Sequence, residues 1–414
     1  MISTTTSTLG DIGKVCMCKR IMKEQTSPEG DIPFYKISTF GEKADCYISR
    51  EIYEDYKTRF SFPKKGDILI SAAGTLGRTV IYDGEDAFFQ DSNIVWIEND
   101  ETKVLNDYLY YFYQTNPWVK TFGSTIPRLY NDNIRSVRIT YPSNMEDQKK
   151  AVAVLKVLDT KISNNTAICS DLEAMAKLIY DYWFVQFDFP DDNGKPYKSS
   201  GGKMVWNEEL KRVIPEGWVV KPFSSLCSMM NGINYDKNEI GDKEYRIANV
   251  RNITASSLLM DENDFDSIVL KSSSADRYVV SKDDILIARS GTPGAVRLIQ
   301  NPSANTIFCG FIIRCVPNDL SNRLYLTYSM KRLEGTTATK TGGSILQNVS
   351  QDTLGSVAIC VPPKTIIEEF NNIIDKILFA IQNTIAENYQ LTKLRDFLLP
   401  MLMNGQIKVG KESL

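Results

Sequence analysis

The sequence contains no histidine among its 414 residues. Histidine is the side chain most often used as a general base, and it is also the commonest metal ligand. Its absence excludes every catalytic triad that depends on an imidazole. An enzyme of this composition would have to work with carboxylates, Lys, Tyr or Cys alone. No arrangement of these residues in the sequence predicts a catalytic site.

Paired cysteines are also missing. The eight cysteines are scattered along the chain, and no CxxC pair occurs among them. Cys16 and Cys18 form a lone CxC, without the second ligand pair that a zinc site requires. We interpret the cysteines as reduced structural thiols of a cytoplasmic protein, and we expect no metal site.

Two further absences concern membranes and secretion. No run of about 18 or more apolar residues is present, so no segment is long enough to span a membrane. The N-terminus lacks the basic start and the apolar stretch of a secretory signal. The formal net charge is −3, which is unusual for a nucleic-acid binder because such domains are generally basic. Charge can still be segregated by surface, and a partner chain can supply phosphate contacts.

The sequence does contain a long internal repeat. Three pairs of matching stretches recur at a nearly constant separation: DILISAAGTLG at 67–77 with DILIARSGTPG at 284–294, LNDYLYYFYQT at 105–115 with LSNRLYLTYSM at 320–330, and GSTIPRLYNDNIRSVRITYP at 123–142 with GSILQNVSQDTLGSVAICVP at 343–362. The separation is too long for a solenoid repeat. We therefore predict a duplicated domain of ordinary size.

The first repeated stretch holds a glycine corner between two apolar runs, which suggests a phosphate-binding loop. A P-loop needs Lys followed by Ser or Thr after its last glycine. Arg78 and Thr79 follow one corner, and Ala295 and Val296 follow the other. Because the residues beyond each corner favour a strand, we predict a strand, a glycine turn and a second strand, with the glycines at positive φ or at a close backbone approach. Direct contact of the corner with a ligand is the alternative.

Each copy of the repeat is followed by a helical segment with apolar or small residues at alternating steps of three and four, as in a coiled-coil seam. The seam positions are Leu155, Leu158, Ile162, Asn165, Cys169, Leu172, Ala176 and Ile179, and then Ile374, Ile377, Ile381, Thr384, Asn388, Leu391, Arg395 and Leu398. Each segment predicts a helix of about 35 to 40 residues. The two helices are most simply each other's partners, and packing of each helix on its own domain is the alternative. Asn165 and Asn388 on the seam would fix the register.

A segment rich in Asp, Gly, Pro and Ser separates the two halves. It reads DFPDDNGKPYKSSGGK at 188–203, which indicates a linker. IPEGW at 214–218 then opens the second copy. The order along the chain is domain, helix, linker, domain, helix.

These strings together resemble a known family. DTKISNNTAICSDLEAMAKLIYDYWFVQFDF at 159–189 is similar to the central conserved region of the specificity subunit of bacterial Type I restriction–modification enzymes. IPEGW, GDILIS, DDILIARSGTPG and the C-terminal LRDFLLPMLMNGQI resemble the same family in the same order. The resemblance covers essentially the whole chain. It departs from the family pattern only where the first domain starts without an entry like IPEGW.

The resemblance implies an α+β fold. Two duplicated, mixed α/β target recognition domains would be separated by two long antiparallel coiled-coil helices, with a pseudo-twofold relation between the halves. The expected boundaries are 1–142 for the first recognition domain, 143–187 for the central conserved helix, 188–213 for the linker, 214–362 for the second recognition domain, 363–403 for the C-terminal conserved helix and 404–414 for a tail.

The resemblance also implies a non-catalytic DNA sequence-recognition subunit in which each domain reads one half of a bipartite, asymmetric target. The helices would hold the domains apart and dock two methyltransferase subunits, and restriction and translocase subunits would join them. S-adenosylmethionine, ATP and Mg²⁺ are then expected in the partner subunits, and no cofactor is expected in this chain. A helical scaffold without DNA specificity is the alternative, and the net charge of −3 supports it. A stand-alone nuclease or methylase is disfavoured because its motifs are missing.

Base edges are read mainly by Arg, Lys, Asn, Gln, Ser and Thr, and phosphates by Arg and Lys. We expect sequence choice to lie in residues of these types that differ between the copies, beside the shared framework strings. The candidate DNA-binding residues are Arg20, Lys36, Ser38, Thr39, Arg78, Arg128, Arg246, Asn249, Arg251, Arg289, Thr292, Gln347 and Asn348. The candidate helix-packing or partner-docking residues are Leu155, Leu158, Ile162, Leu172, Ile179, Ile374, Ile377, Ile381, Leu391 and Leu398. For each DNA-binding candidate, a solvated surface side chain is the alternative.

Overall fold

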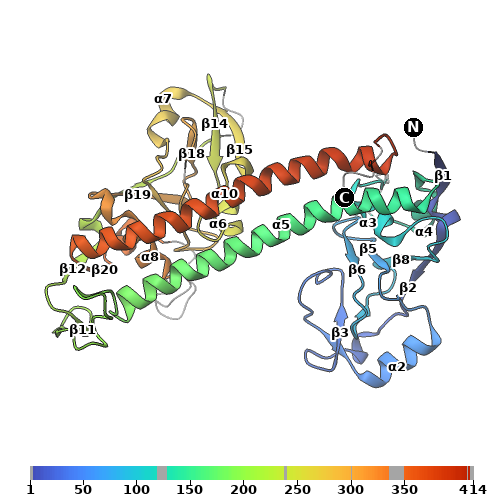
Figure 1. Cartoon of the computed structure of the whole chain (residues 1–414), viewed down its shortest axis with the longest axis horizontal. Helices are drawn as coiled ribbons and strands as arrows, with labels where there is room; N and C mark the ends of the chain where they lie inside the picture. The colour runs from blue at the N-terminus through green and yellow to red at the C-terminus, as the bar shows by residue number, and fades with distance from the viewer. Residues whose placement is uncertain are drawn as a thin grey trace. The chain divides into compact units, whose positions relative to one another are not determined.

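The computed structural model describes residues 3–118, 128–236, 240–299, 301–334, 349–407 and 409–410 (Figure 1). The chain divides into two compact units. Unit 1 consists of Met1–Ser163 and Tyr389–Leu414, and unit 2 consists of Asn164–Asn388. None of the helices in the described part of the chain has the length and apolar character needed to cross a membrane.

Among the described residues of unit 1, the strands form three small sheets. β1 (Thr4–Thr8) pairs with β9 (Arg138–Pro142); the second sheet has the order β2 (Gly13–Met17), β8 (Ile94–Asn99), β5 (Ile68–Ser71), β6 (Thr79–Ile81); the third has the order β4 (Tyr47–Ile48), β3 (Ile32–Tyr35), β7 (Phe88–Phe89). The helices are α1 (Leu9–Ile12), α2 (Arg50–Arg59), α3 (Asn106–Gln114), α4 (Asn131–Ser136), the first half of α5 (Met145–Tyr180) and the C-terminal part of α10 (Lys364–Met403).

The strands of unit 2 form sheets of the same kinds, with one additional hairpin. β12 (Val219–Pro222) pairs with β20 (Ala358–Val361); the second sheet has the order β13 (Cys227–Asn231), β19 (Ile312–Pro317), β16 (Ile285–Ala288), β17 (Val296–Arg297); the third has the order β15 (Asp266–Leu270), β14 (Lys243–Ala248), β18 (Thr306–Phe308); the hairpin is β10 (Met204–Asn207) with β11 (Arg212–Pro215). The helices are the second half of α5, α6 (Val250–Ala255), α7 (Ser272–Ala275), α8 (Arg323–Lys331), α9 (Gln351–Gly355) and most of α10.

The two units repeat one sheet topology. The order β2-β8-β5-β6 corresponds to β13-β19-β16-β17, and β4-β3-β7 corresponds to β15-β14-β18. In both three-stranded sheets, the central strand pairs antiparallel with one neighbour and parallel with the other. The duplication predicted from sequence is therefore confirmed in strand order and in strand direction.

The apolar runs of the repeated stretches form strands that are buried on both faces. In β5, Ile68 and Ile70 belong to a core shared with α3 and α5, whereas Leu69 belongs to a second core around β3 and β7. In β16, Ile285 and Leu286 divide between two cores in the same way. Because successive side chains of a strand point to opposite faces, a wall between two cores needs a continuous apolar run rather than an alternating one.

The glycine corners connect antiparallel strands, as predicted. β5 pairs with β6, and β16 pairs with β17. Gly74 and Gly77 have φ of 67° and 78°, and Gly291 and Gly294 have φ of 78° and 84°. An L-residue adopts this left-handed region only at a cost, so the turn requires glycine at these positions.

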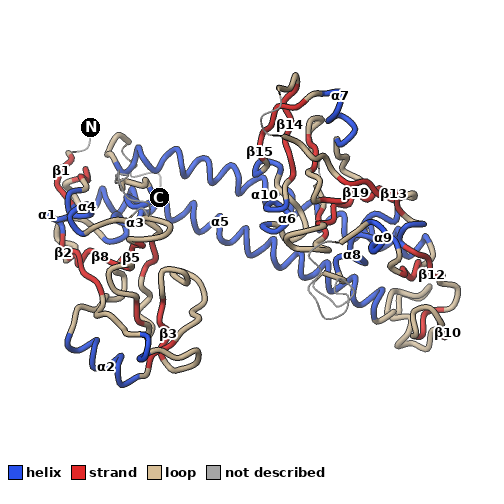
Figure 2. Tube along the Cα trace, turned by 180° about the vertical axis from the view of Figure 1, so that it is seen from behind, coloured by secondary structure: helices blue, strands red, loops and turns tan. Residues whose placement is uncertain are grey.

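Within each unit, α5 and α10 lie side by side and run antiparallel (Figure 1, Figure 2). In unit 1, Arg395 Nη1 donates to Asp159 Oδ1 at 3.1 Å. In unit 2, Asn165 Nδ2 donates to Glu387 Oε2 at 2.7 Å. The predicted seam residues are buried or half-buried at every position: Leu155, Leu158, Ile162, Asn165, Cys169, Leu172, Ala176, Ile179, Ile374, Ile377, Ile381, Thr384, Asn388, Leu391, Arg395 and Leu398. The helices also pack on the hydrophobic cores of their own units. The two helices therefore pack both on each other and on the globular domains.

The predicted linker, 188–213, contains more structure than its composition indicates. β10 and the first residues of β11 fall within it. Phe189 stacks on Tyr197, with ring centroids 4.6 Å apart, and on Trp218, with centroids 5.3 Å apart. These three aromatic side chains give part of the predicted linker a small core to pack against.

Candidate nucleic-acid interface

Unit 1 contains a polar pocket of about 500 Å³ that gathers three of the predicted DNA-binding residues. Arg20 follows β2, Lys36 follows β3, and Arg128 lies shortly before α4. The polar residues that share the pocket with them are Lys23, Thr26, Gln90, Asp91, Ser92 and Asn93. Side chains from segments far apart in the sequence therefore meet in one concave site that is rich in hydrogen-bonding groups.

Acidic and main-chain groups hold the basic side chains of this pocket. Lys36 Nζ lies 2.9 Å from Asp45 Oδ1, and this hydrogen bond raises the pKa of Lys36. Arg128 Nη2 donates to the carbonyl of Ser92 at 3.0 Å and to its hydroxyl at 2.7 Å. Both side chains are half-buried, so they are oriented before any partner arrives.

Three other predicted residues of unit 1 lie near the glycine corner. Ser38 is exposed. Thr39 is only 9% exposed, and its hydroxyl accepts a hydrogen bond from the Lys36 N–H. Thr39 therefore closes a turn, and its hydroxyl is already engaged by the main chain. Arg78 is exposed beside the corner and lies 3.3 Å from Glu42 Oε1.

In unit 2, three predicted residues surround the first residues of β15. Arg251 Nη2 donates to Asp266 Oδ1 at 2.6 Å, and Asn249 Nδ2 donates to Asp266 Oδ2 at 3.1 Å. Arg246 Nη1 lies 3.4 Å from the Phe265 carbonyl. Asp266 thus orients the side chains of Asn249, at the N-cap of α6, and of Arg251, within α6, and it neutralises part of the Arg251 charge.

The remaining predicted residues of unit 2 belong to the second glycine corner. Arg289 Nη1 donates to the Gly310 carbonyl at 3.3 Å, and its buried Nε has no hydrogen-bond partner among the described residues. The Thr292 hydroxyl lies 3.3 Å from the Thr254 hydroxyl of α6. Gln347 and Asn348 lie outside the described residues.

Arg128 and Arg289 bring a guanidinium to equivalent places in the two units. Ser71 pairs with Ile94 in unit 1, and Ala288 pairs with Ile312 in unit 2. This register makes Ser92 equivalent to Gly310, and each of these carbonyls accepts from one of the two arginines. The sequence repeat alone does not align the two arginines, because they reach the same carbonyl from different segments.

Sequence reasoning missed the short polar run before β8. Gln90 Oε1 accepts from the Ile37 N–H at 2.9 Å, and Asn93 lies beside it in the pocket. Amide side chains of this kind pair with adenine edges. The available signal was QDSN directly before the apolar run IVWI, at positions where the second copy has no comparable polar run.

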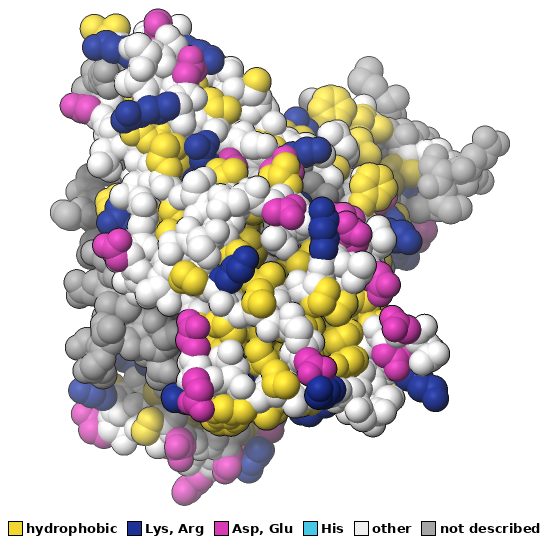
Figure 3. Space-filling view, turned by 90° about the vertical axis from the view of Figure 1, so that its left-hand side faces the viewer, with side chains coloured by type: hydrophobic (Ala, Val, Ile, Leu, Met, Phe, Trp, Pro, Cys, Tyr) yellow, Lys and Arg dark blue, Asp and Glu magenta, His cyan; other side chains and the backbone are white. Residues whose placement is uncertain are grey.

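Basic candidates in both units have acidic neighbours, since Asp45 lies beside Lys36 and Asp266 lies beside Arg251. Figure 3 shows Lys and Arg interspersed with Asp and Glu on the face that it views. All eight cysteines are free thiols, and burial raises the pKa of Cys18 to about 12, which keeps that thiol protonated. No group of three or more Cys, Asp or Glu side chains suited to a metal ion occurs among the described residues.

Comparisons with known proteins match this chain to one protein family over residues of both units. The family described as "Type I restriction modification DNA specificity domain" matches residues 1–174 and 215–394. The chain is 26% identical over 395 residues to the Type I restriction enzyme MjaIX specificity subunit of Methanocaldococcus jannaschii, covering 92% of this chain and 88% of that protein. It is 58% identical over 158 residues to a putative type I restriction enzyme specificity subunit of Haemophilus influenzae, covering 38% of this chain and 41% of that protein.

A solved structure shows the same fold. The S subunit of a Type I restriction-modification system from M. genitalium superposes with a TM-score of 0.56 at 16% sequence identity. The superposition covers 97% of this chain and 96% of that protein. The fold class predicted from the sequence is thereby confirmed.

Proposed function

This chain belongs to the Type I restriction modification DNA specificity family, and we propose that it is the subunit that reads the DNA target of a Type I restriction–modification complex. Unit 1 reads one half of a bipartite target and unit 2 reads the other half. The helical scaffold without DNA specificity, which was the alternative, is not favoured by family membership.

One observation carries the proposal: a single sheet topology occurs twice, with unlike polar side chains at equivalent places. Arg128 and Asn93 line the site in unit 1, where unit 2 offers Arg289 and an exposed Phe311. Framework residues that repeat give both units the same shape, and residues that differ give them different hydrogen-bonding patterns. Two unlike readers on one chain suit an asymmetric target, whereas identical readers suit a palindrome.

The long helices would dock the methyltransferase subunits. In unit 2, α5 and the π-helical segment Asp181–Val185 that continues it expose Ile168, Met175, Leu178 and Tyr182 at steps of seven, three and four, so these side chains share one helix face. The seam residues are buried or half-buried, which supports a packing role for them, and we propose that the exposed stripe contacts the partner. An apolar stripe of this kind on a helix is typical of a protein interface.

Catalysis would reside in the partner subunits. S-adenosylmethionine would serve the methyltransferase, and ATP and Mg²⁺ would serve the restriction and translocase subunits. The family membership supports this division, since the curated relatives are named as specificity subunits. A cytoplasmic location goes with the proposal, because eight free thiols suit a reducing compartment.

The test is a domain exchange in the reconstituted complex. Residues 216–362 are replaced by the corresponding segment of a family member that has a different target, and the methylated motif is read by sequencing. We expect one half of the motif to change and the other half to stay. Exchange of residues 1–142 serves as the matched experiment and should change the opposite half. A wild-type complex without sequence preference, or a single exchange that changes both halves, contradicts the proposal.

A further inference from the structure

α6 is too short to hold its position by itself. It has six residues, and an isolated helix of fewer than about 12 residues is unstable in water. Asn249 caps its N-terminal end, and Arg251 lies in its first turn. Both are candidate DNA contacts, so whatever fixes α6 also fixes the groups that would face the second half of the target.

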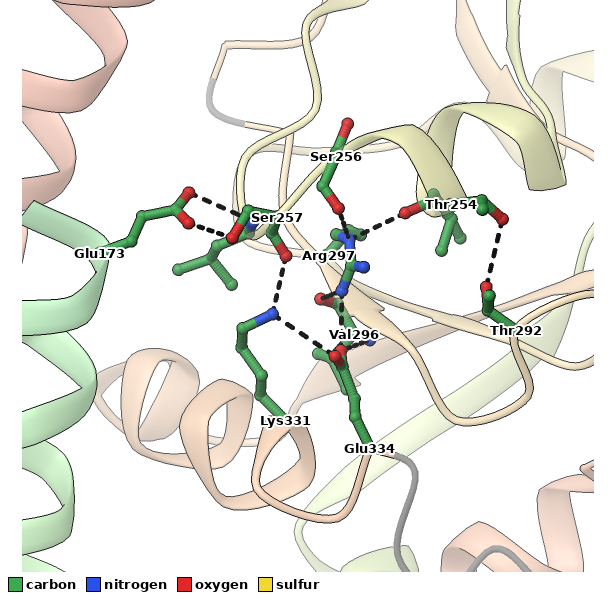
Figure 4. Close-up of polar contacts among 11 residues, drawn as sticks. Glu173, Thr254, Ser256, Ser257, Thr292, Val296, Arg297, Lys331 and Glu334 are labelled. Carbon is green, nitrogen blue, oxygen red and sulfur yellow. Dashed lines mark hydrogen bonds and ion pairs between the residues drawn. The ribbon is translucent and has the colours of Figure 1, made fainter. Parts of the chain in front are cut away.

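The C-terminal end of α6 is held by a buried guanidinium. Arg297 Nε donates to the carbonyl of Ile253 at 3.0 Å and to that of Ser256 at 2.8 Å (Figure 4). These carbonyls have no partner within the helix, and they lie at the negative end of its dipole. Arg297 is only 7% exposed, so these bonds are well shielded from water.

The Arg297 charge is balanced from the end of α8. Arg297 Nη1 donates to Glu334 Oε1 at 2.7 Å, and the same oxygen accepts from the Val296 N–H. Lys331 Nζ donates to the Ser257 carbonyl at 2.7 Å and lies 3.5 Å from Glu334 Oε2. Burial lowers the pKa of Lys331, and the neighbouring Glu334 opposes this shift.

The long helix α5 reaches the same segment. Figure 4 shows Glu173 extending from α5 toward the loop that follows α6. Its carboxylate accepts from the Ser257 hydroxyl, and its other oxygen accepts from the Leu258 N–H at 3.3 Å. The segment that leaves α6 is therefore tied to the element that would carry the methyltransferase.

The opposite side of α6 rests on the second glycine corner. A Cβ on Gly291 would lie 2.5 Å from Val250 Cγ1, so the corner and the first residue of α6 are in direct contact. The Thr254 hydroxyl meets the Thr292 hydroxyl at 3.3 Å. α6 is thus fixed between the corner on one side and the buried charges on the other.

We propose that Glu173 is a positioning residue for DNA reading: through Ser257 and the Arg297–Glu334 pair it fixes α6, so that Asn249 and Arg251 meet the second half of the target. The inference rests on the proposed function and names a residue of the central helix, outside the recognition domain, that governs specificity. Its effect is confined to one half-site, because every contact in the chain of bonds belongs to unit 2.

The test uses the full chain assembled with its methyltransferase subunits. Methylation is measured on two DNA libraries, one randomised in each half of the target. Glu173→Ala should lower discrimination in the second half by about 10-fold, since a hydrogen bond to a charged group is lost, and leave the first half unchanged. Glu173→Gln keeps an acceptor oxygen and should restore most of the discrimination. Glu209→Ala removes an exposed carboxylate of the same unit and should change neither half.

The possible results separate the two levels of the proposal. A wild-type complex without a bipartite preference defeats the proposed function itself. The wild-type complex could instead show a bipartite preference while Glu173→Ala leaves discrimination unchanged or lowers it equally in both halves. This result would overturn only the role of Glu173. If Glu173→Ala does not fold, Ser257→Ala decides the question, because it removes one exposed hydroxyl donor. It should lower second-half discrimination by about 3-fold, and an unchanged second half would overturn the proposal.

Discussion

At the scale of single residues, the chemical type of a side chain selects candidate DNA contacts. The burial of that side chain then shows which candidates are accessible. Arg20, Lys36 and Arg128 were chosen by type, and the structure gathers them in one pocket. Thr39 was chosen by the same rule, but its hydroxyl is used in a turn. Sequence position does not report whether a polar group already has a main-chain partner, so side chains of this kind are the least predictable part of the site.

The equivalence of Arg128 and Arg289 gives the first prediction. Arg128→Ala should weaken recognition of the first half of the target by about 10- to 100-fold, and Arg289→Ala should do the same to the second half, if each guanidinium contacts a base edge. Methylation of libraries randomised in one half measures this. Arg59→Ala removes an exposed arginine that pairs with Asp55 within α2, and it serves as the control. Equal losses in both halves for either variant would contradict the assignment.

Asp67 gives a prediction about pH. Burial raises the pKa of Asp67 above its usual value of 3.8, while its carboxylate accepts from the Lys64 N–H at 2.7 Å. The stability that Asp67 contributes is therefore greatest below pH 3.8 and is lost as the pH rises through the raised folded-state pKa. Asp67→Asn keeps an acceptor without the charge.

The thermal midpoint of Asp67→Asn should rise relative to that of the wild type as the pH is raised from about 4 to 7. Asp284 is the matched position in unit 2, and burial raises its pKa as well. Asp284→Asn should consequently shift in the same direction. A midpoint difference that stays constant across this range would show that the Asp67 carboxylate is not penalised by burial.

At the scale of elements, strands were recognisable while their surroundings were not. The runs ILI in β5 and β16 are apolar at every position, and this pattern predicts a strand buried on both faces. It does not reveal that the two faces belong to different cores. The composition of 188–213 predicted a linker because turn residues dominate it. The stacking of Phe189 on Trp218 is a tertiary contact that composition does not reveal.

The glycine corner predicts a difference between two alanine variants. Gly66 and Gly77 both have positive φ, so either substitution costs about 1–2 kcal/mol in backbone strain. A Cβ at Gly77 would also lie 2.1 Å from Trp118 Nε1, whereas a Cβ at Gly66 has open space. Gly77→Ala should therefore lower the thermal midpoint of the full chain clearly more than Gly66→Ala does. Equal midpoints would mean that Trp118 moves aside without cost.

The exposed stripe on α5 predicts the effect of a charge. Leu178→Asp should abolish copurification with the methyltransferase subunit, because docking would bury an unpaired carboxylate. Ser170→Asp adds the same charge to an exposed position on another side of the helix and should leave the complex intact. The thermal midpoint of each variant alone checks that the fold survives. Normal capture by Leu178→Asp would place the docking surface elsewhere.

At the scale of the whole molecule, one sheet topology occurs in both units, and we propose that specificity comes from the residues that differ between them. The net charge of −3 fits this arrangement, because the basic candidates are oriented by acidic partners such as Asp45 and Asp266. A chain of this kind contributes base contacts more readily than a broad positive field.

DNA binding by the assembled complex should weaken as salt is raised, because phosphate contacts release counterions. Plots of the logarithm of the affinity against that of the salt concentration assign the roles of Arg20 and Lys36. An alanine variant that loses a phosphate contact should reduce the slope by about 1, whereas one that loses a base contact should keep the slope and lower the specificity. Binding that is insensitive to salt would favour a protein scaffold over a DNA reader.

The sequence by itself determined the duplication, the two long helices, the strand–glycine–strand corners and the family. These features depend on local periodicity, on glycine's access to positive φ and on repeated strings, all of which are written along the chain. Only the tertiary structure decided that Arg128 and Arg289 are equivalent, that Thr39 is buried, and that Glu173 of α5 holds the loop after α6. Contacts of this kind join residues distant in sequence, and they arise from packing and burial rather than from any pattern of neighbours.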